Sequence, residues 1–296
     1  MSETQNEADQ QPAAGKKKPN VKAIIAAVVI ALAVIGGGAY WYVNYQIPHQ
    51  QAVDAFNAAS DALDARAAKV DKAIAKLQKL QKSRDEPLDP ATDEAASAAI
   101  GQAQAAKQTA PDMPSETDAI NAAAKKVDKM GQYQEQLDAL ATAQQNLQNS
   151  IDQLKQVTNP SEAFVVERLT GLPNVTGVEA VTETNDPNGK LNKAGGYTAA
   201  VYFSSDLVPA GEAMANEEYT GIPAVGCDGG GCVEVFATAE DAESRNSYLA
   251  NFDGNALLAP GSHEVLGTCV VRTSDKITAS QQQALTQSIK DSLTRL

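Results

Sequence analysis

Three cysteines and one histidine are the residues of 160–296 whose types could carry chemistry. Cys227 and Cys232 enclose the glycine-rich segment Asp228–Gly231. Thiols at this spacing can close a small ring, and disulfides persist outside the cytoplasm. We therefore predict a Cys227–Cys232 disulfide, with Cys232–Cys269 as the alternative. Strand alternation puts Cys269 on the same face as Val265 and Val271, as a buried and unreactive thiol.

Other site chemistries fit these residues less well. A zinc site needs N, S or O ligands at a characteristic spacing, which three cysteines and His263 do not match. A Cys–His nucleophile pair would also use His263, but no activating motif accompanies it. Asp186–Gly189 has calcium-type oxygens without the loop length or closing Glu of an EF-hand, and suits a hairpin turn better. Gly229–Gly231 is not followed by the Lys and Ser/Thr of a phosphate loop. We expect no catalytic residue, metal site or cofactor.

Several loops of this region could contact a ligand. Exposed loops on a rigid scaffold are the usual place for binding residues. The candidate surface contacts are Asp186, Asn188, Tyr219 and Asp228. Each of these residue types also suits a turn.

A compact α+β domain over residues 160–296 must position these residues. Apolar alternation and capping residues, such as Thr238 with Asp241, define its elements. The expected order is a helix over 161–169, strands over 176–183, 197–203 and 232–237, a helix over 238–249, a strand over 265–272 and a helix from 278. This order predicts a mostly antiparallel sheet of about four strands with helices on one face.

Residues 49–159 are rich in Ala, Gln, Lys and Asp and predict a helical stalk. Apolar residues at steps of three and four form a coiled-coil stripe. The phase of this stripe shifts near Tyr133, which indicates a local stammer in the supercoil. Three helices are expected, over 49–83, 91–109 and 115–158, separated by proline-containing turns. An antiparallel bundle within one chain is the first choice, and a homodimeric coil through the stalk is the alternative.

Residues 23–53 contain no Asp, Glu, Lys or Arg. The part over 23–45 is about long enough to cross a bilayer core as a helix. Lysines precede it and Tyr and Trp follow it, which predicts a cytoplasmic N-terminus and an extracellular remainder. Residues 1–22 are expected to be a disordered cytoplasmic tail. The alternative is a cleavable signal peptide, with Gly37 and Ala39 at a cleavage-like spacing.

The chain is acidic, with a formal net charge of −13. Residues 160–296 contain 18 Asp and Glu against eight Lys and Arg. Nucleic acids and anionic membrane surfaces both require a basic face. The composition therefore argues against a nucleic-acid partner.

Several strings of residues 160–296 resemble a module of membrane-anchored Gram-positive cell-surface proteins, sometimes labelled extracellular-matrix-binding. They are NVTGVEAVTE, NDPNGKLNKAGGYTAAVYFSSD, GCVEVFATAEDAESRN and GSHEVLGTCVVRTS. The module has no established activity, so the resemblance implies a bacterial cell-surface setting and no catalytic residue.

These features together predict a single-pass plasma-membrane protein that presents a non-enzymatic binding module on a helical stalk. Its expected ligand is a protein or a cell-wall polymer. A structural or scaffolding subunit of an envelope complex, acting through the coiled-coil region, is the alternative. A hydrolase comes third.

Overall fold

The computed structural model describes residues 21–83, 85–255 and 259–296. These residues form two compact units, each described here by itself. The first holds the described residues up to 67 and residues 108–132, and the second holds residues 68–107 and 133–296. The disordered tail expected over residues 1–22 falls almost wholly outside the described residues.

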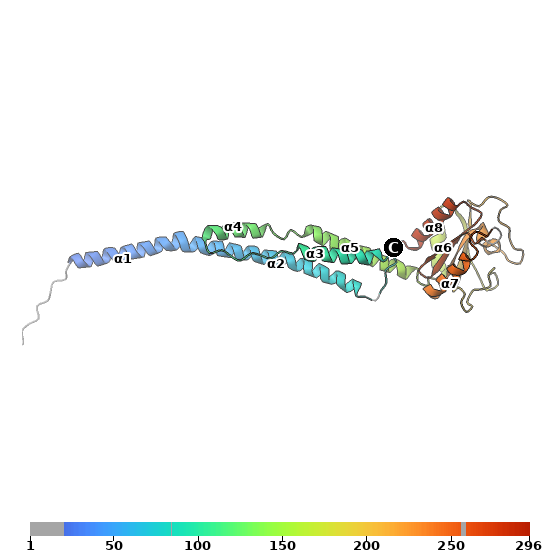
Figure 1. Ribbon diagram of the computed structural model, residues 1–296, viewed down its shortest axis with the longest axis horizontal. Coiled ribbons are helices and arrows are strands. Elements are labelled where there is room, and N and C mark those ends of the chain that lie inside the picture. The colour runs from blue at the N-terminus through green and yellow to red at the C-terminus, as the bar shows by residue number, and fades with distance from the viewer. Residues whose placement is uncertain (1–20, 84, 256–258) are drawn as a thin grey trace, which may run out of the picture. The chain divides into compact units, whose positions relative to one another are not determined.

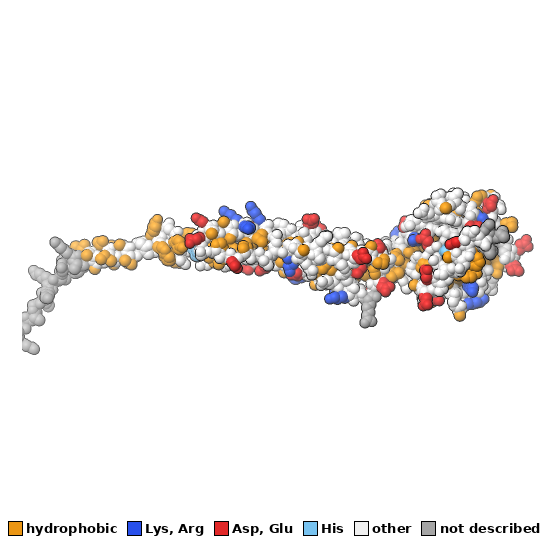
Figure 2. All heavy atoms as spheres, in the orientation of Figure 1, with side chains coloured by type: hydrophobic (Ala, Val, Ile, Leu, Met, Phe, Trp, Pro, Cys, Tyr) orange, Lys and Arg blue, Asp and Glu red, His pale blue; other side chains and the backbone are white. Residues whose placement is uncertain are grey.

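The first unit begins with the apolar helix α1 (Val21–Trp41), which continues through a short π-helical segment, η1 (Tyr42–Gln46), into α2 (Ile47–Gln81). Its apolar side chains face outward, as the 67% exposure of Ile35 illustrates, and Figure 2 shows them along this helix. In lipid, a helix satisfies its own backbone hydrogen bonds, so its apolar side chains need no burial against protein. Among the described helices, this one is long and apolar enough to cross a membrane, and a signal sequence would meet the same criteria.

Helix α4 (Thr117–Asp128) packs beside the first part of α2 in this unit. The imidazole Nδ1 of His49 lies 3.1 Å from Thr117 Oγ1, and Arg66 Nη1 donates to the Asp128 carbonyl at 3.2 Å. The two contacts follow the same chain order, so α4 runs parallel to α2. The buried apolar side chains of the pair are Phe56, Leu63, Ile120 and Val127.

The helical part of the second unit contains the rest of α2, α3 (Ala91–Ala106) and α5 (Gln134–Gln156). Gln81 Nε2 donates to the Asp93 carbonyl at 3.2 Å, and Lys107 Nζ pairs with Asp71 at 2.7 Å. Helix α3 therefore runs antiparallel to α2. It is also antiparallel to α5, whose Ser150 carbonyl accepts from the Leu88 amide at 3.0 Å.

The single helix expected over 115–158 is wrong, because α4 ends at Asp128 and α5 begins at Gln134. Gly131 between them has φ +66°, in the left-handed region that ends helices. The shift in apolar phase near Tyr133 therefore marks an interruption and not a distortion of one continuous helix.

The sheet of the second unit has five antiparallel strands, which confirms the α+β class but not the expected number of about four. The strands are β1 (Val175–Ala180), β2 (Ala199–Ser205), β3 (Gly230–Val235), β4 (Ser262–Leu266) and β5 (Cys269–Thr273), in the order β1-β2-β3-β5-β4. The expected strand over 265–272 is a hairpin turning at Gly267, which has φ +60°. A Cβ on Gly267 would lie 2.5 Å from the Val157 carbonyl oxygen, so only glycine fits this turn.

Helices cover both faces of the sheet, and the expectation of one covered face is wrong (Figure 1). The α8 face carries α6 (Glu162–Leu169) and α8 (Ala279–Leu293), packed on Val201, Phe203, Val233 and Val271. The α7 face carries α7 (Ala239–Ala250) and the short helix η2 (Ile222–Gly229). Its strand residues include Ala200, Tyr202, Cys232, Val270, Glu234 and Arg272. Successive strand residues point to opposite faces, so the same strands supply both sets.

The core on the α8 face extends past the expected domain start at residue 160. Val157 is fully buried in it. The Thr268 amide donates to the Val157 carbonyl at 2.9 Å, and the Asn159 amide donates to Thr268 Oγ1 at 2.6 Å. The turn between β4 and β5 thus holds the end of α5.

Candidate functional site

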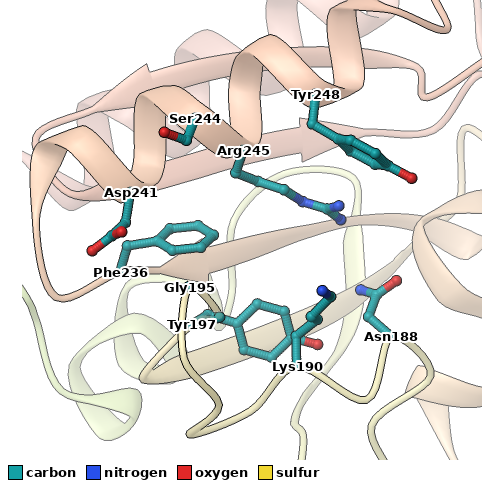
Figure 3. Close-up of a pocket in the computed structure, with 10 residues that line it drawn as sticks. Asn188, Lys190, Gly195, Tyr197, Phe236, Asp241, Ser244, Arg245 and Tyr248 are labelled. Atoms are coloured by element: carbon teal, nitrogen blue, oxygen red, sulfur yellow. The ribbon is translucent and has the colours of Figure 1, made fainter.

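A cavity of about 550 Å³ lies on the α7 face, between α7 and the loop that joins β1 to β2. Its volume is within the range of small-ligand sites. The loop contributes Asn188, Lys190 and Tyr197, Phe236 follows β3, and α7 contributes Arg245 and Tyr248 (Figure 3). We call this cavity the α7 pocket.

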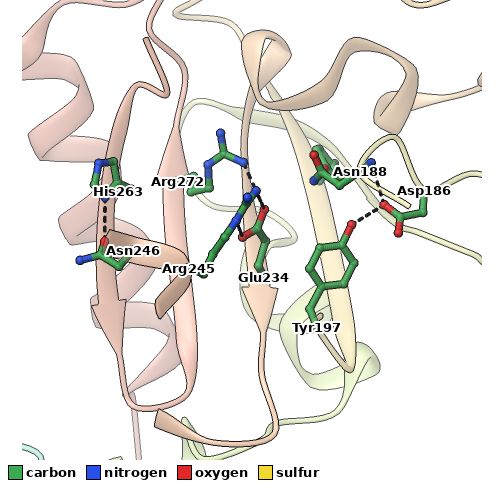
Figure 4. A network of polar contacts seen from close by, with 9 residues as sticks. Asp186, Asn188, Tyr197, Glu234, Arg245, Asn246, His263 and Arg272 are labelled. Atoms are coloured by element: carbon green, nitrogen blue, oxygen red, sulfur yellow. Dashed lines mark hydrogen bonds and ion pairs between the residues drawn. The ribbon is translucent and has the colours of Figure 1, made fainter. Parts of the chain in front are cut away.

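Asp186 holds the loop side of the α7 pocket in place. Its carboxylate accepts from the backbone amides of Asn188, Lys190 and Leu191 at 3.0, 2.6 and 2.8 Å, and from the Tyr197 hydroxyl (Figure 4). Burial raises the pKa of Asp186, but these hydrogen bonds outweigh it and hold the pKa below its usual value. Asp186 is 4% exposed, so its prediction as a surface contact is wrong.

Two further contacts fix the loop on the sheet. The Asn188 side chain is exposed at the pocket, as its prediction as a surface contact requires, and its amide donates to Tyr202 Oη at 2.9 Å. The buried Tyr197 ring meets Phe236 edge-on, with 6.2 Å between ring centroids. One wall of the α7 pocket is therefore formed before any ligand arrives.

A buried charge cluster forms the back of the α7 pocket. Glu234, in the central strand β3, is 0% exposed. Arg245 Nε and Nη2 donate to its two carboxylate oxygens, both at 2.8 Å, and Arg272 Nη1 donates to Oε1 at 3.1 Å (Figure 4). Burial disfavours the charge on Arg245, but Glu234 outweighs this effect and raises its pKa. Two cations on one carboxylate leave the cluster with an excess of one positive charge.

Two cationic donors of the α7 pocket have no acceptor within the part of the chain that the structure describes. They are Nη1 of Arg245, whose other guanidinium nitrogens bind Glu234, and Nζ of Lys190. Lys190, Arg245 and Arg272 are three of the eight Lys and Arg of residues 160–296. The carboxylates of Asp186, Glu234 and Asp241 balance these three charges, so the pocket has free cationic donors without a net positive charge.

The cysteines lie on both faces of the sheet. Cys232 is buried on the α7 face, and Cys227 of η2 packs beside it, with a hydrogen bond between the two thiols. Burial raises the pKa of Cys227, but this hydrogen bond and the charge of Arg272 hold it below its usual value. The structure has all three cysteines as thiols, and the Cys227–Cys232 disulfide stays a prediction.

Cys269 belongs to the α8-face core, and burial raises its pKa to about 12. The side chains of Cys232 and Cys269 point to opposite faces of the sheet, which excludes the alternative Cys232–Cys269 pairing. The predicted burial of Cys269 is confirmed. Its expected neighbour Val265 instead packs toward the α7 face, because the two residues lie on different strands of the hairpin.

The remaining candidate residues lie outside the lining of the α7 pocket. Tyr219 is half-buried in the connection between β2 and η2, and exposed Asp228 lies 3.7 Å from Lys276 Nζ. His263 Nδ1 lies 2.7 Å from Asn246 Oδ1, and its Nε2 lies 3.2 Å from Asp253 Oδ1. The surroundings of His263 therefore suit a structural role.

Sequence reasoning missed the charge cluster and the cationic lining. Glu234 carried a usable signal, because a carboxylate inside the apolar strand CVEVFA requires a partner when it is buried. Lys190 and Tyr248 carried no signal that distinguishes them from other exposed loop and helix residues.

Within residues 21–83, 85–255 and 259–296, no three His, Cys, Asp or Glu side chains are grouped to hold a metal ion. The chemistry of the α7 pocket is instead that of aromatic faces, amide and hydroxyl groups, and two free cationic donors. A comparison with known protein families, curated proteins and solved structures finds no match to this chain.

Proposed function

We propose that this chain is a single-pass cell-envelope protein that binds a cell-wall polymer through the α7 pocket without chemically changing it. The observation that carries the proposal is the preformed pocket, whose aromatic walls and free cationic donors are fixed by Asp186 and Glu234. Binding sites typically combine an apolar lining with a few placed polar groups. The apolar α1 helix supports the anchored part of the proposal.

The carboxylates around the α7 pocket favour binding over hydrolysis. Asp186 is occupied by the loop, and Glu234 by two arginines. Asp241, at the rim, accepts from Thr238 Oγ1 at 2.6 Å in the cap of α7. A hydrolytic acid or base must be free to exchange a proton with its substrate. Asp186 and Glu234 are thus committed to the scaffold, and Asp241 has one of its two oxygens committed to the cap of α7.

The orientation rests on the lysines that precede the apolar run. Positive residues remain on the cytoplasmic side, so the second unit should face outward. In a variant without native cysteines, a new cysteine at exposed Ser247 should react with an impermeant maleimide in intact cells. A cysteine at Ser2 should react only after lysis. Reaction at Ser2 alone would reverse the orientation, and a mature chain starting near Tyr40 would identify a cleaved signal.

Wall binding is tested by co-sedimentation of the full chain, in mild detergent, with purified wall sacculi. We expect the wild-type chain to pellet with the sacculi. Tyr248→Ala, at a 53% exposed ring on the pocket rim, should lower the bound fraction. The matched variant Tyr219→Ala, outside the pocket, should bind like wild type. Equal loss in both variants, or no sedimentation at all, would refute the proposal.

A further inference from the structure

We infer that the α7 pocket recognises a carboxylate-bearing sugar ring, such as a uronic acid unit of a polymer. This inference rests on the proposed function and specifies its ligand class. Three properties of the lining support this inference: its unused cationic donors, its aromatic residues and its mixture of donors and acceptors.

The unused donors of Lys190 and Arg245 define where the carboxylate binds. Figure 3 shows the Lys190 amine and the Arg245 guanidinium directed to the same end of the α7 pocket, near Asn188. Glu234 takes Nε and Nη2 of Arg245, which fixes the guanidinium plane and leaves Nη1 for a ligand. A charge-assisted hydrogen bond from a preoriented guanidinium is stronger than one between neutral groups. Arg272 adds positive potential behind this end.

The aromatic residues suit an uncharged body attached to that carboxylate. Tyr197, Phe236 and Tyr248 come from three different segments and line one cavity. Tyr197 and Phe236 are only 1% and 2% exposed, so most of the aromatic surface open to a ligand belongs to Tyr248, which is 53% exposed. The C–H faces of a sugar ring provide matching apolar area, and such burial is favourable.

The other polar groups suit the hydroxyls of a sugar. Ser244 adds a hydroxyl, and Asp241 lies at the end of the lining opposite Lys190, with Oδ1 free of the cap contact that occupies Oδ2 (Figure 3). Hydroxyls donate and accept, so they can use the acceptors at one end and the donors at the other. A second carboxylate at the Asp241 end would be repelled, which favours a ligand with one acid group.

The position of the α7 pocket argues against an extended peptide. Peptides commonly bind by adding a strand to a sheet edge, where the backbone is unpaired. The edges of this sheet are β1 and β4, whereas the pocket lies over the face of the sheet beneath α7. A compact ring fits such a site better than a chain that must run along a strand.

The test is calorimetric titration of the full chain in detergent micelles with glucuronate and with glucose. The two probes differ in one carboxylate, so we expect glucuronate to bind at least about tenfold more tightly, as one charge-assisted hydrogen bond allows. Lys190→Met should remove about tenfold of that preference. Lys193→Met, an exposed lysine of the same loop outside the lining, should leave it unchanged. Circular dichroism on each variant confirms that it is folded.

The outcomes separate this inference from the proposed function. Equal binding of glucuronate and glucose, or equal effects of the two lysine variants, overturns the carboxylate assignment. Tighter binding of N-acetyl-Ala-Ala, a free peptide carboxylate, overturns the sugar assignment. In both cases, sedimentation with sacculi that still depends on Tyr248 leaves wall binding standing. If the wild-type chain does not sediment with sacculi, or if its sedimentation does not depend on Tyr248, the proposed function itself is refuted.

Discussion

The two faces of the sheet differ in what the same strands contribute to them. On the α8 face, the strand residues are mostly apolar and pack on Leu285 and Ile289 of α8. On the α7 face, the alternating residues include the charged side chains of Glu234 and Arg272. One face therefore supplies mainly stability, and the other supplies a scaffold for chemistry. Glu234 and Arg272 can be buried on the second face because they are ion-paired with each other, and Glu234 is also paired with Arg245.

The largest effect is expected from breaking the charge cluster. Glu234→Gln removes the carboxylate and leaves two largely buried arginines without a counter-ion, which should cost about 3–5 kcal/mol in the free energy of unfolding. Urea denaturation measures this cost. Replacing Glu234, Arg245 and Arg272 together by leucine should recover much of the stability and abolish binding. If the Glu234→Gln variant is as stable as wild type, the charge cluster is not needed for the fold.

The matched change on the α8 face is Ile289→Ala. Removing this fully buried side chain should cost about 2–5 kcal/mol, through lost apolar burial and a cavity. Because Ile289 does not line the α7 pocket, the folded fraction should bind sacculi as wild type does. Weakened binding by fully folded Ile289→Ala protein would contradict the separation of the two faces.

A smaller effect is expected from Asp186→Asn, which weakens the acceptor that holds the pocket loop. Loss of charged hydrogen bonds should cost about 1–3 kcal/mol. Because the folded pKa of Asp186 is lowered, its contribution is present above the ordinary pKa of 3.8 and is lost as pH falls through the folded value. The stability gap between wild type and variant should therefore be constant near neutral pH and close below about pH 4. A gap that widens on acidification would contradict the assigned sign.

The smallest effect is expected from the cysteine pair. Non-reducing peptide mapping should find Cys227 bonded to Cys232 and Cys269 as a free thiol. The ring is small, so Cys227→Ser should fall toward the low end of the range of about 0–5 kcal/mol that disulfides contribute. Rapid labelling of Cys269 in the folded protein would show that the α8-face core is not closed around it.

The local elements of the fold were predictable because their signals are local. Thr238 caps α7 by accepting from the Asp241 amide, as its spacing with Asp241 indicates. Thr278 likewise begins α8, with a reciprocal contact to Gln281. The hairpin of β4 and β5 was missed because VLGTCVVR is mostly apolar and reads as one strand, whereas the left-handed backbone of Gly267 reveals the turn.

The site was less predictable because tertiary contacts assemble it. Glu234, Arg245 and Arg272 come from β3, α7 and β5, and no sequence spacing brings these three elements together. The prediction for Asp186 failed for a different reason. It was expected at the surface as a turn-forming residue, but its own loop buries it. The covering of both faces was also missed, because the strands are buried on both sides and lack the regular apolar and polar alternation of a half-exposed sheet.

Hydrogen–deuterium exchange of the full chain, with and without solubilised wall fragments, tests the central claim most directly. Ligand binding in the α7 pocket should slow exchange in α7 and in the loop over 185–197, with no change in α6 or α8. Protection confined to α2, α3 and α5 would support the scaffolding alternative. Protection of α8, or none anywhere at saturating wall fragment, would contradict a binding site on the α7 face.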